Sequence, residues 1–217
     1  MTIWFATGNI HKKKELSDIL SPFFSGAAKS GAASNLKIDL RIPAEAGFEF
    51  EPEENGTSFL ENALIKAREL HRLLEEKRPP FYKSGDPVIA DDSGLCVDAL
   101  GGKPGIYSAR YGGKDIDSKG KNALLLAELG DNPRRGAHFV CAMILYFGNN
   151  HFFAAQETLE GELVRNSEAA RGNGGFGYDP ILYIPSLYRT VAELADDEKN
   201  RISHRGKAGM AIGKLLC

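Results

Sequence analysis

Short apolar runs alternate with helical patterns along this chain. The runs predict buried strands, because they hold apolar, β-branched and aromatic residues bounded by turn residues. They cover residues 3–6, 88–90, 95–97, 138–147, 152–158 and 181–184. Helical patterns begin near Lys12, cover residues 58–77 and 119–129, and return at residues 203–216. This order predicts a mixed α/β fold in which helices flank a twisted sheet.

Two local signals sharpen this prediction. Ser58 and Glu61 have the S-x-x-E spacing of a capping box, which marks the start of the longest helix. Gly-Asn-Asn at residues 148–150 joins two strand-like runs and predicts a β-hairpin, and hence an antiparallel part of the sheet. Residues 21–35 are rich in Ser, Ala and Gly without a period, so we expect a mobile connection there.

Composition bounds the class of protein. The 217 residues are enough for one cooperative domain with a sizeable core. Because 27 Lys and Arg nearly balance 29 Asp and Glu, no bulk field attracts nucleic acid or an anionic membrane. The three widely spaced cysteines fit free thiols in a reducing compartment. The first residues enter an apolar strand without a signal peptide or a membrane span, so we expect a cytoplasmic protein.

Two adjacent carboxylates follow the apolar run at residues 88–90. Asp91 and Asp92 are expected at the carboxyl end of a buried strand, where open α/β sheets bind ligands and where carboxylate oxygens can hold Mg²⁺. The same Asp-Asp-Ser-Gly sequence is also ordinary turn chemistry, in which short polar side chains bond their own backbone. The pattern alone leaves both interpretations open.

Two further stretches place charged residues next to helix starts. Thr7-Gly8-Asn9 with Lys12 combines a glycine turn, a helix amino terminus and a lysine, which is typical of a phosphate cradle. A structural turn followed by a solvated lysine face explains the same residues equally well. Glu54 precedes the long helix and Lys66 lies inside it, but an acid there also complements the helix dipole, and Lys66 also fits a surface position.

A glycine-rich loop lies at residues 172–177. It formally matches G-x-G-x-x-G, but a strand follows it in place of a helix, so we reject a dinucleotide-binding fingerprint. No Walker A sequence occurs in the chain. The loop offers Phe176 and Tyr178 as stacking faces, while His204 and Arg205 at a helix start can donate to an anion or a base carbonyl. Together the clusters suggest a nucleotide site, with phosphates on lysines, metal on carboxylates and the base on an aromatic ring.

Six motifs in order resemble the Ham1/RdgB family of inosine triphosphate pyrophosphatases. They are TGNxxK at 7–12, SFLENA with KAR at 58–68, ADDSGL at 90–95, GIYSARY at 105–111, GGFGYDP at 174–180 and SHRG at 203–206. The resemblance spans nearly the whole chain. It implies a single ITPase-like α/β domain over residues 1–217, with two lobes around a central cleft, and a homodimer. It also implies Mg²⁺-dependent hydrolysis of dITP, ITP and XTP to the nucleoside monophosphate and pyrophosphate.

The resemblance implies roles for individual residues as well. Glu54 and Asp92 would bind Mg²⁺, and Asp92 would accept a proton from water, a role in which Asp91 is the alternative. The residues expected to bind substrate are Thr7, Gly8, Asn9, Ile10, His11, Lys12 and Lys66 for the triphosphate, Ser93, and Phe176, Gly177, Tyr178, Asp179, Lys199, His204 and Arg205 for base and sugar. Donors near His204 and Arg205 would favour a 6-oxopurine over adenine.

Two other functions remain as alternatives. One is a Maf-like pyrophosphatase that acts on modified or pyrimidine triphosphates, which the Ser-His-Arg sequence at residues 203–205 disfavours. The other is a nucleotide-binding module without catalysis, which the intact Asp91, Asp92, Glu54 and Lys66 disfavour. A nucleic-acid-binding role has the least support, because the net charge is -2 and no basic stripe is present.

Overall fold

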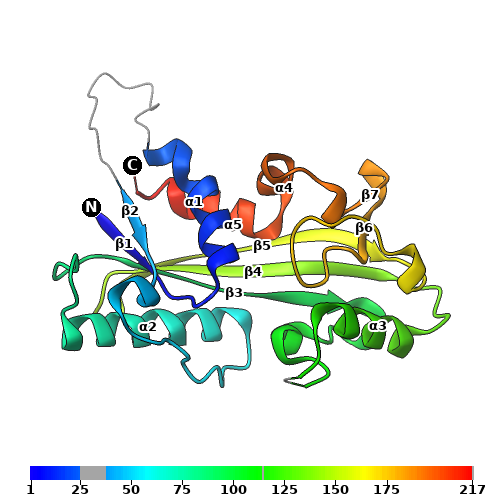
Figure 1. The fold of residues 1–217 in the computed structure, drawn as a ribbon, viewed down its shortest axis with the longest axis horizontal. Helices are drawn as coiled ribbons and strands as arrows, with labels where there is room; N and C mark the ends of the chain where they lie inside the picture. The colour runs from blue at the N-terminus through cyan, green and yellow to red at the C-terminus, as the bar shows by residue number, and fades with distance from the viewer. Residues whose placement is uncertain (25–37, 114, 217) are drawn as a thin grey trace. The chain divides into compact units, whose positions relative to one another are not determined.

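The computed structural model describes residues 1–24, 38–113 and 115–216. Within these ranges the strands form a seven-stranded sheet in the order β2-β1-β3-β4-β5-β6-β7 (Figure 1). The strands are β1 (Thr2–Phe5), β2 (Asp39–Arg41), β3 (Val88–Val97), β4 (Gly136–Tyr146), β5 (Phe152–Leu163), β6 (Leu182–Ile184) and β7 (Arg189–Thr190). The helices are α1 (Ile10–Phe24), α2 (Phe59–Lys77), α3 (Ser118–Leu129), α4 (Asp196–Ile202) and α5 (His204–Gly213).

The sheet is mixed, as the sequence predicted. β1 pairs in parallel with both β2 and β3, whereas β6 pairs antiparallel with both β5 and β7. β4 and β5 are neighbours joined by a short turn in which Gly148, Asn149 and Asn150 all have positive φ. So short a connection permits only an antiparallel pair, which confirms the predicted hairpin.

The chain divides into two compact units. Unit 1 comprises Met1–Asp92, Cys141–Glu157 and Arg205–Cys217, and unit 2 comprises Ser93–Val140 and Thr158–His204. β3, β4 and β5 each contribute residues to both units. No helix in the described ranges combines the length and apolar character that a membrane span requires.

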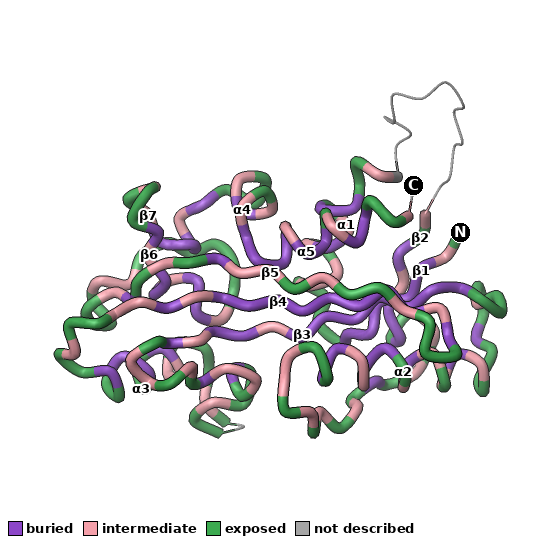
Figure 2. The backbone as a smooth tube through the Cα atoms, turned by 180° about the vertical axis from the view of Figure 1, so that it is seen from behind, coloured by how far each residue is buried: buried purple, intermediate pink, exposed green. Residues whose placement is uncertain are grey.

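In unit 1 the sheet is covered on both faces, and Figure 2 shows its strands as largely buried. Ile3, Phe5 and Ile89 belong to the cluster that includes residues of α1 and α5, whereas Trp4 and Val88 belong to the cluster that includes residues of α2. The two sets alternate along each strand, because successive side chains point to opposite faces. The strands therefore appear in the sequence as continuous apolar runs.

Unit 2 has its own apolar cluster, in which Leu125 and Leu129 of α3 pack with residues of β3, β4 and β5. Asp117 caps α3 by accepting the Gly120 N–H, and Gly130 follows the last turn with a positive φ. α3 and α4 lie on opposite sides of the strands of this unit (Figure 1). The predicted helix at residues 119–129 is thus confirmed.

The structure differs from the sequence predictions at three elements. Ser58 caps α2 by accepting the Glu61 N–H, but the Glu61 carboxylate accepts from Thr57 in place of Ser58. The predicted last helix at residues 203–216 corresponds to α5 and ends earlier, at Gly213, and the short helix α4 before it, which ends at Ile202, was not predicted. The predicted mobile connection at residues 21–35 is wrong for residues 21–24, which continue α1, and the rest of it lies outside the described residues.

Candidate active site

The turn between β1 and α1 is held by its own side chains. The Thr7 Oγ1 accepts the Asn9 N–H at 3.1 Å, and the Asn9 Oδ1 accepts the N–H groups of His11 and Lys12 at 2.9 and 3.3 Å. Asn9 therefore caps the first turn of α1, as asparagine commonly does. This fixes the direction in which the Lys12 side chain leaves the helix.

Gly8 has no conformational reason to be glycine. It is not among the glycines with positive φ, and the nearest atom to a built Cβ would be the Phe50 carbonyl oxygen at 4.0 Å. Gly8 lines a cavity, so the missing side chain leaves open space there. Ile10 and His11, the other residues predicted in this motif, are both exposed at the start of α1.

The two aspartates lie inside β3 and not at a turn. The strand continues through Asp91 and Asp92 to Val97, so the prediction that it ends at these carboxylates is wrong. Turn propensity is overridden because both side chains are buried and each accepts from cationic partners. β1 does stop at Phe5, which pairs with Ile89, so the carboxylates still lie just beyond the carboxyl end of the neighbouring parallel strand.

Asp91 points to the α1 and α5 face. Its carboxylate accepts from the Lys12 Nζ at 3.1 Å and from the Arg205 Nε and Nη2 at 3.1 and 3.0 Å. The Arg205 Nη1 also donates to the Glu15 Oε2 at 2.7 Å. Burial alone would raise the pKa of Asp91, but the neighbouring cations of Lys12, Arg205 and Lys66 hold it well below its usual value. Asp91 therefore stays ionised and is a poor proton acceptor.

Asp92 points to the α2 face, as strand alternation requires. Its Oδ1 accepts from the Lys66 Nζ at 3.1 Å and its Oδ2 from the Asn62 Nδ2 at 3.2 Å. The same Lys66 ammonium donates to the Glu54 Oε1 at 3.1 Å. Burial, with a smaller contribution from the Glu54 charge, raises the pKa of Asp92 despite Lys66. Of the two aspartates, Asp92 is therefore the better proton acceptor.

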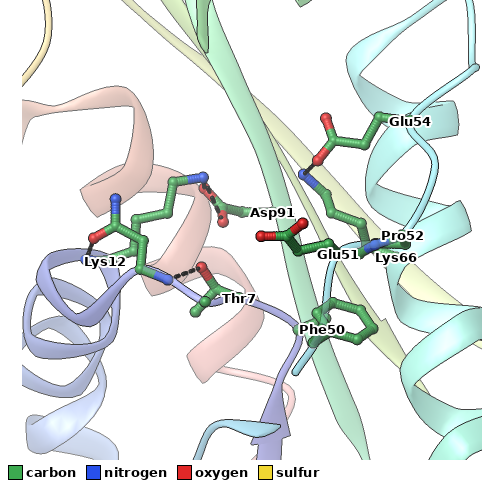
Figure 3. Close-up of a pocket in the computed structure, with 11 residues that line it drawn as sticks. Thr7, Lys12, Phe50, Glu51, Pro52, Glu54, Lys66 and Asp91 are labelled. Atoms are coloured by element: carbon green, nitrogen blue, oxygen red, sulfur yellow. Dashed lines mark hydrogen bonds and ion pairs between the residues drawn. The ribbon is translucent and has the colours of Figure 1, made fainter. Parts of the chain in front are cut away.

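These groups meet at one cavity of about 600 Å³ in unit 1. Figure 3 shows Lys12 and Asp91 on one side of it, and Lys66 and Glu54 on the other. The lining residues are Ala6, Thr7, Gly8, Asn9, Lys12, Phe50, Glu51, Pro52, Glu54, Lys66 and Asp91. Asp92 lies beside the cavity through its contact with Lys66. The structure thus brings Thr7, Gly8, Asn9, Lys12 and Lys66 together with the predicted metal residues, whereas Ile10 and His11 do not line the cavity.

The carboxylates of this site suit a hard divalent cation that is bound together with a phosphate group. Glu54 and Asp92 supply carboxylate oxygens that already share one ammonium group. Among the described residues, no group of three or more His, Cys, Asp or Glu side chains could hold a metal ion alone. A divalent ion bound by one or two carboxylates and completed by phosphate oxygens and water is the arrangement that Mg²⁺ commonly adopts with nucleotides.

The glycine loop of unit 2 is organised by Asp179. Its Oδ2 accepts the Phe176 N–H at 2.8 Å and the Lys199 Nζ at 2.9 Å. Gly175 has a positive φ, and a Cβ there would lie 2.0 Å from the same oxygen, so only glycine fits. The Lys199 ammonium lies 5.0 Å from the centre of the partly exposed Phe176 ring. The loop therefore presents an aromatic face beside a buried ion pair.

Tyr178 is not a stacking face, contrary to the prediction. Its ring is buried in the core of unit 2, and its hydroxyl donates to the Ser108 carbonyl at 2.9 Å. Burial raises the pKa of Tyr178 to about 12. The carbonyl oxygen of the preceding residue, Gly177, accepts a hydrogen bond from the Asn122 Nδ2 at 3.1 Å. Both residues hold the loop in place and leave Phe176 as its accessible ring.

The side chains of His204 and Arg205 point to different surroundings and not to one common binding position. The His204 ring is buried and stacks on Phe139, with ring centres 4.8 Å apart. Arg205 is 1% exposed and its guanidinium pairs with Asp91 and Glu15. Its guanidinium is held by the carboxylate that also contacts Lys12, and its contact with the base stays a prediction. Ser93 follows Asp92 in β3 as a partly buried residue at the start of the unit 2 part of the chain.

Sequence reasoning missed Glu15 and Asn62. Asn62 lies one helical turn before Lys66, and the buried residues of α2 other than these two are apolar. A polar residue at that position was a signal that could have been used. Glu15 lies one turn after Lys12 on α1 and gave no comparable signal, because its partner Arg205 is 190 residues away.

The sequence model of the Ham1 family matches residues 3–214. The chain belongs to the Ham1 family. It is 39% identical over 219 residues to the dITP/XTP pyrophosphatase of Treponema denticola, covering 100% of this chain and 98% of that protein. It is 42% identical over 188 residues to the protein of the same name from Geobacillus kaustophilus, covering 85% and 86% of the two chains.

A solved Ham1 structure has the same fold. The Ham1 protein of Coxiella burnetii superposes with a TM-score of 0.80 at 34% sequence identity, covering 100% of this chain and 98% of that chain. The expected α/β fold and the family resemblance are thereby confirmed.

Proposed function

We propose that this protein hydrolyses the non-standard purine nucleoside triphosphates dITP, ITP and XTP to the nucleoside monophosphate and pyrophosphate, and so cleanses the nucleotide pool. The observation that carries the proposal is the unit 1 cavity, where Lys12 and Lys66 meet Glu54 and Asp91 beside a capped helix start. Relatives from Treponema and Geobacillus named dITP/XTP pyrophosphatase support the choice of substrate.

The lysines would bind the triphosphate. Lys12 and Lys66 both line the cavity, and each is held by a carboxylate that fixes its position. Their charges would neutralise the phosphate oxygens and the departing pyrophosphate, which is the largest part of catalysis in phosphoryl transfer. Because Gly8 lacks a side chain, the phosphates could approach the β1–α1 turn closely.

Water would attack the α-phosphorus, and the bond to the bridging oxygen would break as pyrophosphate leaves. The family resemblance assigns the proton of this water to Asp92, whereas Asp91 is held ionised by Lys12 and Arg205 and is the poorer acceptor. Glu54 and Asp92 would hold Mg²⁺, which supplies positive charge to the phosphates when bound. Asp91, Arg205 and Glu15 would act on the reaction through Lys12.

The base and sugar would be bound by residues of unit 2. Phe176 supplies the accessible ring, and Lys199 with Asp179 supplies a buried polar pair beside it. The family resemblance also suggests roles for Gly177, Tyr178 and His204 at this site. Tyr178 would support the glycine loop, and His204 would support the start of α5. The same resemblance supports the further proposals of a homodimer, a cytoplasmic location and one domain with two lobes.

A single assay tests this function. Pyrophosphate release is measured with ITP, dTTP and ATP, each with Mg²⁺. We expect rapid release from ITP and slow release from dTTP and ATP. Preference for dTTP would indicate a Maf-like enzyme, and binding of ITP without release would indicate a non-catalytic module; either result would overturn the proposal.

A further inference from the structure

The Asn62 side chain bonds both to Asp92 and to the backbone two residues after Glu54, the other candidate metal-binding residue. It is 0% exposed near the start of α2, and both ends of its amide have partners. The Oδ1 accepts the Gly56 N–H at 2.9 Å, and the Nδ2 donates to the Asp92 Oδ2 at 3.2 Å. A buried amide with both ends bonded to different segments restricts the position of each.

The chemistry of the partners fixes the orientation of this amide. The Gly56 N–H can only donate, so the Asn62 oxygen must face it, and the nitrogen must then face Asp92. One Asp92 oxygen accepts from this neutral amide, while the other accepts from Lys66 at 3.1 Å. The two oxygens of Asp92 are therefore held separately, by groups of different charge.

The other end of the amide reaches the segment that carries Glu54. Gly56 is two residues from Glu54, and a Cβ at Gly56 would lie only 2.7 Å from the Asn62 Oδ1. The backbone of this segment is thus drawn against α2 as closely as glycine permits. The Asn62 side chain thus connects the Glu54 segment to Asp92, in addition to the bridge that Lys66 makes between the Glu54 and Asp92 carboxylates.

We propose that Asn62 is a positioning residue for the divalent-metal site, which it assembles by fixing Asp92 and the Glu54 segment relative to each other. This inference rests on the proposed function and deepens it. Residues that orient metal ligands commonly contribute 10- to 100-fold to metal affinity or activity. The effect should appear in metal binding, because the Asn62 side chain bonds to Asp92 and to Gly56 near Glu54, and not to the phosphate-binding Lys12.

Two substitutions disturb this contact from opposite sides. Asn62→Ala removes both hydrogen bonds, and Gly56→Ala forces the Gly56 backbone away from Asn62. Glu61→Ala is the matched control, because Glu61 links the same helix start to Thr57 but contacts neither carboxylate. Melting temperature is measured for all three variants, so that loss of folding is recognised.

The first measurement is Mn²⁺ binding in the presence of α,β-methylene ITP, which is not hydrolysed. We expect Asn62→Ala and Gly56→Ala to weaken Mn²⁺ binding by about 10- to 100-fold and Glu61→Ala to leave it unchanged. The second measurement is Mg²⁺ dependence of pyrophosphate release. The first two variants should need correspondingly more Mg²⁺, while KM for ITP at saturating Mg²⁺ stays close to that of the unsubstituted protein.

Other outcomes would overturn the inference. Unchanged Mn²⁺ affinity in both variants, with or without a lower melting temperature, would show that Asn62 has only a structural role. Equal weakening by Glu61→Ala would show that any loosening of the helix start has the same effect. Failure of the proposed function is recognised separately, because the unsubstituted protein would then bind Mn²⁺ and the analogue without releasing pyrophosphate from ITP.

Discussion

The buried charge network around Asp91 gives the most direct prediction about stability. Asp91 and Arg205 are each 1% exposed, and with Lys12 and Glu15 they form two cations and two anions. Asp91→Asn removes one anion and leaves a net positive charge among largely buried side chains. An asparagine also presents an amide donor to groups that can only donate.

The expected loss follows from these contacts. Breaking a buried ion pair by removing one partner costs about 3–5 kcal/mol, a large part of the roughly 5–15 kcal/mol that stabilises a domain. We expect about 3 kcal/mol, the low end, because the Lys12 side chain is 17% exposed and can turn into the cavity. Asp197→Asn is the control, since Asp197 forms an exposed pair with Arg201 and its loss should cost less than about 1 kcal/mol.

Urea unfolding followed by tryptophan fluorescence measures this loss. Trp4 is the single tryptophan and is buried in unit 1 with Asp91, so its signal reports the affected unit. Because the folded-state pKa of Asp91 is lowered, its stabilisation is present above about pH 4 and disappears as the pH falls below that value. The difference in the free energy of unfolding between the unsubstituted protein and Asp91→Asn should therefore become smaller below about pH 4. A shift in the midpoint no larger than that of Asp197→Asn would refute this reasoning.

Three further predictions concern the site. Arg205→Ala should lower turnover of ITP and ATP by the same factor, because its guanidinium is engaged by Asp91 and Glu15; a selective gain for ATP would restore its role in base recognition. Gly8→Ala should keep the melting temperature but raise KM for ITP, since its Cβ would enter the cavity; an unchanged KM would exclude a close approach of phosphate. In absorbance titration at alkaline pH, the signal that Tyr178→Phe lacks should belong to a phenol with a pKa of about 12; a missing signal centred near the ordinary value of about 10 would contradict this. The contribution of this phenol to stability should be present below about pH 10 and lost as the pH rises through 12.

Local patterns predicted most of the fold. The continuous apolar runs at residues 3–6 and 138–147 correspond to strands covered on both faces, and α2 begins after its predicted cap at Ser58. β3 was the clear failure. Its turn-forming residues Asp91 and Asp92 remain extended because partners from α1, α2 and α5, far away in the sequence, neutralise them. No window of sequence contains that information.

For the candidate site too, the sequence could not predict contacts between residues that are far apart along the chain. Motifs identified Lys12, Lys66, Glu54 and Asp92, and the structure places them around one cavity or beside it. The motif containing Arg205 could not show that its guanidinium is occupied by carboxylates, since that depends on how α5 packs against β3 and α1. Residue type and spacing predict which groups gather, but their pairing depends on tertiary packing.

Turnover of Asp92→Asn is the most direct test of the proposed chemistry. Pyrophosphate release is measured at saturating ITP and Mg²⁺, and the melting temperature is measured in parallel. We expect turnover at least about 100-fold below that of the unsubstituted protein, which is the scale of a lost acid–base or metal-binding group. Undiminished turnover in a folded Asp92→Asn protein would contradict the assignment of this cavity as the catalytic site.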